Sequence, residues 1–115
     1  MTDHDLKELF ATSAGTVYQC NRFNQYVLDF DGHLSIFKAV DFFYFKKEVE
    51  NINLEEMLQS TSRSTDVAIL MPHYTTTCFI LTPSKVVRLK ELLEGSAFTI
   101  QLNSMVYECL QVNLT

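Results

Sequence analysis

The chain contains one strand-and-helix pattern twice, and this pattern constrains the fold more than any other feature. Residues 34–37 alternate as a β-strand and residues 41–49 continue as a helix, and residues 78–81 and 85–93 follow the same pattern 44 residues later. The aligned apolar pairs are Ile36 with Ile80, Phe37 with Leu81, Phe42 with Val86, Phe45 with Leu89 and Val49 with Leu93. We therefore expect two copies, residues 16–59 and 66–111, each with two strands and two helices; chance similarity is the alternative.

A chain of 115 residues is expected to form one domain, residues 1–115. Its 47% hydrophobic and 20% charged residues favour a globular protein over a disordered one. The expected fold class is α+β. We predict a mainly antiparallel sheet of about five strands, packed on one side by helices.

The first part of the chain changes from a helical to a strand pattern of apolar residues. Leu6, Leu9 and Phe10 share one face of a helix over residues 3–12, which Gly15 is expected to end. Residues 25–30 then alternate as a strand, and Asp31-Gly32 predicts a turn. A three-residue loop would place Phe30 opposite Leu34 and Leu28 opposite Ile36, so that the apolar faces match, and we prefer it to a two-residue loop.

Four further segments have recognisable helix signals. Phe42, Phe45, Val49 and Ile52 form a stripe along a helix over residues 39–51. Asn53 is expected to cap a short helix over residues 54–59, with Leu54, Met57 and Leu58 inward. Thr82-Pro83 starts the next helix, and Gly95 is expected to end it. Residues 96–111 fit either strands or a helix capped by Ser96. The helical stripe comprises Phe98, Leu102, Met105, Val106, Cys109 and Leu110, and the repeat favours it.

Two further segments complete the prediction, a linker between the copies and the first strand of the second copy. Residues 60–65 are rich in serine and threonine, which is typical of a linker. Residues 66–71 are nearly all apolar, which predicts a strand buried on both faces.

Charge and hydropathy exclude several function classes. The net charge of −5 and the pI of about 5.0 disfavour nucleic-acid binding, because phosphate contacts need a basic face. No apolar stretch approaches the roughly 20 residues of a membrane span. The N-terminal residues do not resemble a secretory signal, and the three cysteines form no CxxC pair. We therefore expect a cytoplasmic protein with free thiols and no membrane or nucleic-acid partner.

No pattern predicts a catalytic, cofactor or metal site. His33, His73, Cys20 and Cys78 could bind zinc chemically, but they lack the local spacing of zinc ligands. Cys20, His33 and Asp29 could meet across neighbouring strands as a nucleophile, base and orienting group. Since a cysteine is more often a buried apolar residue, we expect no such catalysis. The three glycines are far apart, so no phosphate-binding loop is predicted.

Aromatic residues are the one surface feature with a functional signal. Residues 42–45 are Phe-Phe-Tyr-Phe, which places four rings on one helical turn. Phe43 and Tyr44 lie off the buried stripe. They therefore either widen the core or form an interface, where aromatic residues are enriched. Phe43 and Tyr44 are our candidate interface residues, and a homodimer is predicted to use this helix.

Residues 20–23 (Cys-Asn-Arg-Phe), residues 30–34 (Phe-Asp-Gly-His-Leu) and the aromatic helix of residues 42–45 carry a family resemblance. Together the stretch from Tyr18 to Val49 resembles small, uncharacterised bacteroidete-type domains of unknown function. Those domains have a cysteine-bearing strand, a hairpin and an aromatic junction between strand and helix. The sequence departs from them in lacking a second cysteine just upstream of Cys20. The resemblance implies no activity.

Two functional hypotheses follow from the sequence. The first is a small non-enzymatic protein that acts through self-association or protein partners. The second is a small-molecule-binding domain or enzyme with a pocket between sheet and helices, near Cys20 and His33. A polar cavity at those two residues would favour the second, and an exposed apolar patch over Phe43 and Tyr44 would favour the first.

Overall fold

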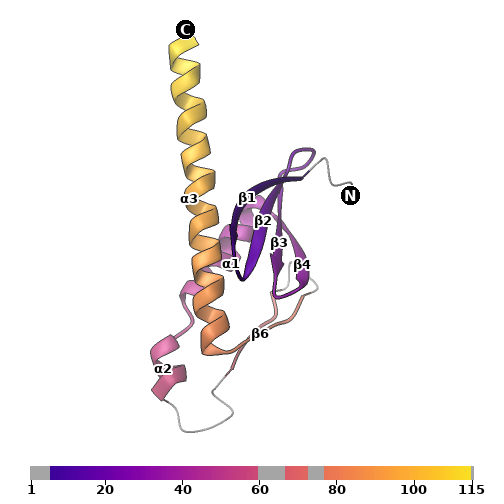
Figure 1. Ribbon diagram of the computed structural model, residues 1–115, viewed down its shortest axis with the longest axis vertical. Coiled ribbons are helices and arrows are strands. Elements are labelled where there is room, and N and C mark those ends of the chain that lie inside the picture. The colour runs from indigo at the N-terminus through magenta and orange to yellow at the C-terminus, as the bar shows by residue number, and fades with distance from the viewer. Residues whose placement is uncertain (1–5, 60–66, 73–76, 115) are drawn as a thin grey trace.

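The computed structural model describes residues 6–59, 67–72 and 77–114, with side chains to residue 110. Within them the fold is α+β, with a four-stranded sheet, a two-stranded sheet and three helices (Figure 1). The elements are β1 Leu6–Thr12, β2 Gly15–Cys20, β3 Gln25–Phe30, β4 His33–Lys38, α1 Ala39–Glu50, α2 Leu54–Gln59, β5 Ala68–Leu70, β6 Phe79–Leu81 and α3 Pro83–Leu114.

The larger sheet is an antiparallel meander in the order β1-β2-β3-β4, and helices cover one of its faces. Helix α3 packs on β1 and β2, α1 packs on β3 and β4, and the two helices contact each other. This confirms the α+β class and the antiparallel sheet with helices on one side. The sheet has four strands instead of about five, because β5 and β6 pair only with each other in the part of the chain that is described.

Aromatic rings join all these layers into one core. Phe37 of β4 stacks on Phe45 of α1 with ring centroids 5.0 Å apart, and Phe45 lies 4.7 Å from Phe79 of β6. On the other side Phe42 lies 5.0 Å from Tyr26 of β3. The rings therefore connect the small sheet, α1 and the large sheet, with apolar side chains of α3 completing the core.

The N-terminal segment is a strand, so the helix predicted over residues 3–12 is wrong where the structure describes it. β1 pairs with β2, and the register shifts between Glu8 and Phe10, which leaves Leu9 as a bulge. The bulge lets both Leu9 and Phe10 pack toward the core. The bulge therefore explains why the adjacent residues Leu9 and Phe10 share one side, as neighbours on a helical face also can.

Gly15 begins β2 and does not end a helix. A side chain at this position would collide with the carbonyl oxygen of Asp29 on the neighbouring strand β3. The residue is therefore a glycine because two backbones approach each other closely here.

The hairpin between β3 and β4 has a two-residue loop, so the predicted three-residue loop is wrong. Phe30 pairs with His33, and Leu28 pairs with Ser35. Asp31 and Gly32 have φ angles of 54° and 78°, which is the left-handed geometry of a tight type I′ turn. This turn places Leu34 and Ile36 on the solvent face of the sheet, where they are 67% and 46% exposed. Buried Ser35 instead forms a 2.8 Å hydrogen bond with Thr77.

The five aligned pairs of the two strand-and-helix patterns share the same burial. Ile36 and Ile80 are both exposed, and the members of the other four pairs are all at most 1% exposed. Both strands lie in sheets and lead into α1 and α3. A repeat is nevertheless not confirmed, because α1 and α2 are separate helices whereas α3 is one helix.

Helix α3 continues through Gly95, so the predicted end at Gly95 and cap at Ser96 are wrong. A side chain on Gly95 would collide with the ring of Phe10 on β1. Ser96 is fully buried, and its hydroxyl donates a 2.6 Å hydrogen bond to the Leu92 carbonyl within the helix. Gly95 therefore permits close packing of α3 on β1, and the helical reading of residues 96–111 is correct.

Among the remaining predictions, two helix caps are confirmed and two predictions of burial are wrong. The Thr82 and Asn53 caps are confirmed, since each side chain accepts a backbone N–H bond three residues later, at 3.3 and 3.0 Å. Leu58 was predicted inward but is 66% exposed, and the strand at residues 66–71 is not buried on both faces, since Ile69 is 60% exposed. The predicted linker, residues 60–65, and His73 lie outside the described residues.

Candidate functional site on the arm of α3

Helix α3 extends well beyond the sheet (Figure 1). Its 32 residues make it about 48 Å long at 1.5 Å per residue, and the whole protein measures 60 Å in its longest direction. Every residue from 101 to 110 is exposed. We call the part of α3 from residue 96 to residue 110 the arm.

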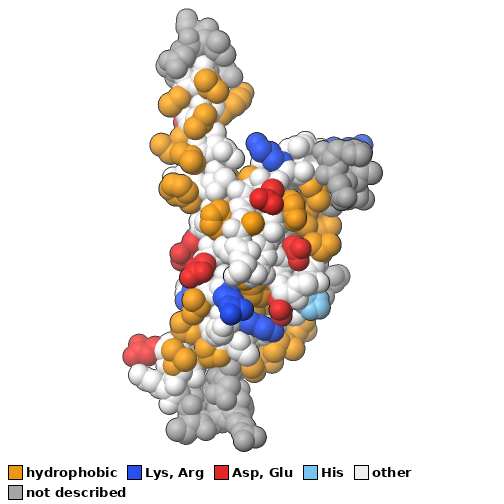
Figure 2. Space-filling model, viewed as in Figure 1, with side chains coloured by type: hydrophobic (Ala, Val, Ile, Leu, Met, Phe, Trp, Pro, Cys, Tyr) orange, Lys and Arg blue, Asp and Glu red, His pale blue; other side chains and the backbone are white. Residues whose placement is uncertain are grey.

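The arm has an apolar face that points away from the sheet. Its six residues fall within an arc of about 140° at 3.6 residues per turn. They are Phe98, Leu102, Met105, Val106, Cys109 and Leu110, which we call the outer row. The five apart from Cys109 are 45–65% exposed, and the Cys109 thiol is exposed too. Figure 2 shows hydrophobic side chains gathered along this side of the arm.

The arm is also nearly free of charge. Glu108 is the single charged residue among residues 96–110 of the sequence. Closer to the sheet, by contrast, the exposed face of α3 carries Arg88, Glu91 and Glu94. Ordinary solvent-facing helix surfaces are charged, whereas the centres of protein interfaces are depleted of charge and enriched in large apolar residues. The composition of the arm is therefore that of an interface.

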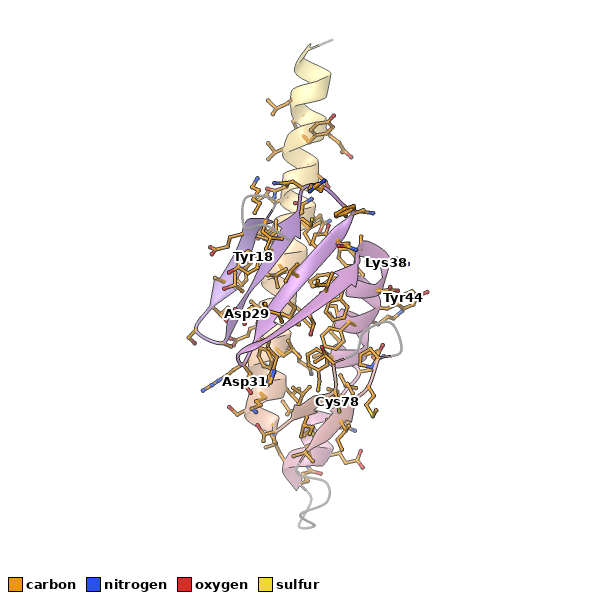
Figure 3. The ribbon with its side chains drawn as sticks, turned by 90° about the vertical axis from the view of Figure 1, so that its right-hand side faces the viewer. Tyr18, Asp29, Asp31, Lys38, Tyr44 and Cys78 are labelled. Atoms are coloured by element: carbon orange, nitrogen blue, oxygen red, sulfur yellow. The ribbon has the colours of Figure 1, made fainter. Side chains whose placement is uncertain are left out.

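The predicted interface residues Phe43 and Tyr44 lie on α1, and both are partly exposed. Phe43 is 41% exposed, and its ring meets Tyr26 edge-on at 6.2 Å and Phe42 at 5.6 Å. Tyr44 is 60% exposed and projects outward beside the sheet (Figure 3). The Phe43 ring thus contacts two core rings but remains exposed, and Tyr44 contributes to the surface.

A hollow of about 400 Å³ lies between the arm and the central strands β2 and β3 of the sheet. Tyr26 lines it and contacts the Phe43 ring, and burial raises the pKa of the Tyr26 hydroxyl. The hollow is lined by Gln19, Tyr26, Ile100, Asn103, Ser104, Tyr107 and Glu108. Six of these seven residues carry a polar group, and none of them belongs to the outer row.

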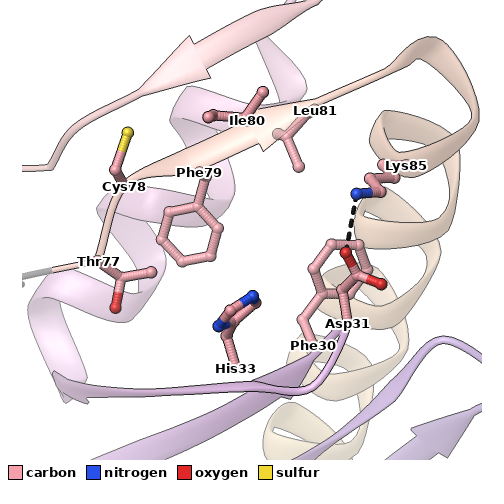
Figure 4. A pocket seen from close by; sticks show the side chains of 9 residues that line it. All are labelled: Phe30, Asp31, His33, Thr77, Cys78, Phe79, Ile80, Leu81 and Lys85. Carbon is pink, nitrogen blue, oxygen red and sulfur yellow. Dashed lines mark ion pairs between the residues drawn. The ribbon is translucent and has the colours of Figure 1, made fainter.

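A second cavity, of about 180 Å³, lies between the Asp31–Gly32 turn and β6 (Figure 4). Lys85 contacts the Asp31 carboxylate at 2.8 Å. The hydrogen bond and positive charge of Lys85 hold the pKa of Asp31 below its usual range. His33 and Cys78 also line the cavity, but Cys78 turns away from His33 (Figure 4). Ligand pockets usually measure about 300–1,000 Å³. This cavity is therefore too small for most metabolites.

The proposed nucleophile group does not assemble. Cys20 is buried and pairs with Gln25 at one end of β3, whereas His33 pairs with Phe30 at the other end. Five residues of strand separate these ends, about 17 Å at 3.3 Å per residue. Cys20 and His33 therefore share no pocket. Among the described residues no three His, Cys, Asp or Glu side chains gather where they could bind a metal ion.

Comparisons with known proteins give no match. No family model, curated protein or solved structure matches the chain. The resemblance of the stretch from Tyr18 to Val49 to bacteroidete-type domains therefore stays a prediction. Over the residues described, no helix has the length and apolar character to cross a membrane.

The sequence identified the outer row as a helical stripe but did not predict what the stripe faces. The six residues are those of the predicted stripe, and the structure turns them to solvent. The missed signal was the absence of charge on the opposite face. An amphipathic helix that packs on a core carries charged residues on its other face, and residues 96–107 contain none.

Proposed function

We propose that this protein is non-enzymatic and acts by associating with itself through the outer row of α3. The exposed outer row carries this proposal. A helix that stays in water normally has charged residues on its surface, whereas this arm has apolar side chains along one face and a single charged residue, Glu108. We further propose that the protein acts in the cytoplasm, where its three thiols would stay reduced.

The exposed area of the outer row suits a small stable interface. Its side chains are about half exposed, so each has about 100 Å² left to bury, which makes about 600 Å² per chain and about 1,200 Å² for a pair. That value lies at the lower end of specific interfaces.

Light scattering on the purified protein tests the proposal. We expect the wild-type chain to have a mass that is a multiple of 13.3 kDa. Leu102→Glu places a carboxylate in the centre of the row. Burying an unpaired charge costs several kcal/mol, so the association constant should fall at least about 100-fold. The variant should then run as a monomer with unchanged helix content by circular dichroism.

Two matched variants locate the interface. Ser104→Glu adds the same charge to the opposite face of the same arm and should leave the mass unchanged. Tyr44→Glu tests the α1 surface, which the sequence predicted as the dimer interface. If Tyr44→Glu dissociates the protein and Leu102→Glu does not, the interface lies on α1. A wild-type mass of 13.3 kDa at high concentration would end the proposal of self-association.

A further inference from the structure

We infer that a second copy of this chain covers the outer row, with the two arms running antiparallel. The inference rests on the proposed function and specifies the geometry of the association. In this arrangement Leu102 packs against the partner's Met105, and Phe98 packs against the partner's Cys109. The two sheets then lie at opposite ends of the paired arms.

The spacing of the outer row fits pairing with another helix. Phe98, Leu102, Met105 and Cys109 are separated by four, three and four residues, which is the seam of a two-helix coil. Val106 and Leu110 flank this seam on one side. Ile100, on the opposite side of α3, packs on the protein's own core, so the seam is free to meet a partner.

A second copy fits the row because the row is uncharged and complementary to itself. The chain has a net charge of −5, so two copies repel each other over most of their surface. The row itself contains no ionisable side chain apart from the Cys109 thiol, so it is the part of α3 where two copies approach without like-charge contact. A symmetric pair needs one patch that matches itself, and this seam does.

The charges at the base of the arm decide the direction. In a parallel pair the seam continues toward the sheet through Glu91 and Arg88, and each would face its own copy in the partner. Like charges facing each other are destabilising. In an antiparallel pair the apolar segment from Phe98 to Leu110 overlaps only itself. In addition, α2 packs beside the lower part of α3, so its copy would crowd a parallel pair there (Figure 1).

Disulfide trapping tests the direction. The background is Cys78→Ser, which removes the other exposed thiol and leaves Cys20 buried. In an antiparallel pair, Phe98→Cys faces the partner's Cys109. Oxidation with diamide then joins the two thiols as a disulfide while diamide is reduced and takes up both protons. We expect a covalent dimer of twice the 13.3 kDa chain mass, reversed by dithiothreitol.

The controls separate the alternatives. With Cys109 alone, the antiparallel pair gives no covalent dimer, since two copies of this residue lie near opposite ends of the seam. Phe98→Cys combined with Cys109→Ser should also give none. A covalent dimer through Cys109 alone would overturn the antiparallel direction. A dimer by light scattering without either cross-link would overturn the seam while leaving self-association standing, and a monomer would overturn both.

Discussion

Replacing Gly95 by alanine should destabilise the protein, although the same change stabilises most helices. Alanine is favoured over glycine inside a helix by about 1 kcal/mol. Here, however, a side chain on Gly95 collides with the Phe10 ring, which must move off α3. Phe10 is partly buried, and complete removal of a buried Phe side chain costs about 3–5 kcal/mol. Loss of about half of that packing outweighs the helical gain, which leaves a net loss of about 1 kcal/mol.

A double-mutant cycle measures this competition by urea unfolding, monitored by circular dichroism at fixed protein concentration. In the Phe10→Ala background the ring is absent, so Gly95→Ala should stabilise by about 1 kcal/mol. The sign of the Gly95→Ala effect should therefore reverse, with a coupling of about 2 kcal/mol between the two sites. If Gly95→Ala raises the stability of the wild-type chain, the ring does not restrict this position and the account of the continuous helix is wrong.

Three smaller predictions concern the turn and the start of α3. Thr82→Ala should lower the free energy of unfolding by about 1 kcal/mol, because the hydrogen bond from the Lys85 N–H is lost, while Thr82→Ser should retain most of it; urea midpoints report both. Gly32→Ala should cost about 1–2 kcal/mol, because alanine resists a φ of 78°, and thermal unfolding should show Gly32→Asn to be milder. Lys85→Met should raise the pKa of Asp31 toward its usual value, followed by carbon NMR of the carboxyl group. Because the pKa is lowered in the folded state, the ion pair stabilises the wild type above the ordinary Asp pKa. The stabilisation is lost as the pH falls through the lowered pKa. The free energies of unfolding of the wild type and of Lys85→Met should therefore become closer in acid.

Local signals predicted those parts of the fold in which one element determines its own burial. The stripe of α1 and the caps at Asn53 and Thr82 are short-range features, and the structure confirms them. β1 could not be predicted in this way. The bulge that brings Leu9 and Phe10 to one side exists only once β2 is paired beside β1.

The hairpin register failed for a related reason. We matched apolar faces across the turn, but the left-handed Asp31-Gly32 pair fixed a two-residue loop and left Leu34 and Ile36 in solvent. The sequence predicted the residues of the candidate site but not their exposure. Periodicity identified every member of the outer row, but it cannot tell a stripe that meets the core from one that meets a partner. That distinction depends on where the sheet ends relative to α3.

The contact between Phe10 and Gly95 joins the first strand to the last helix of the chain. During synthesis, β1 emerges from the ribosome long before the residues that cover it. The meander of β1 to β4 can pair early, but half of its inner face waits for α3. A nascent chain stopped before Pro83 should therefore expose a half-covered sheet and depend on chaperones until translation is complete.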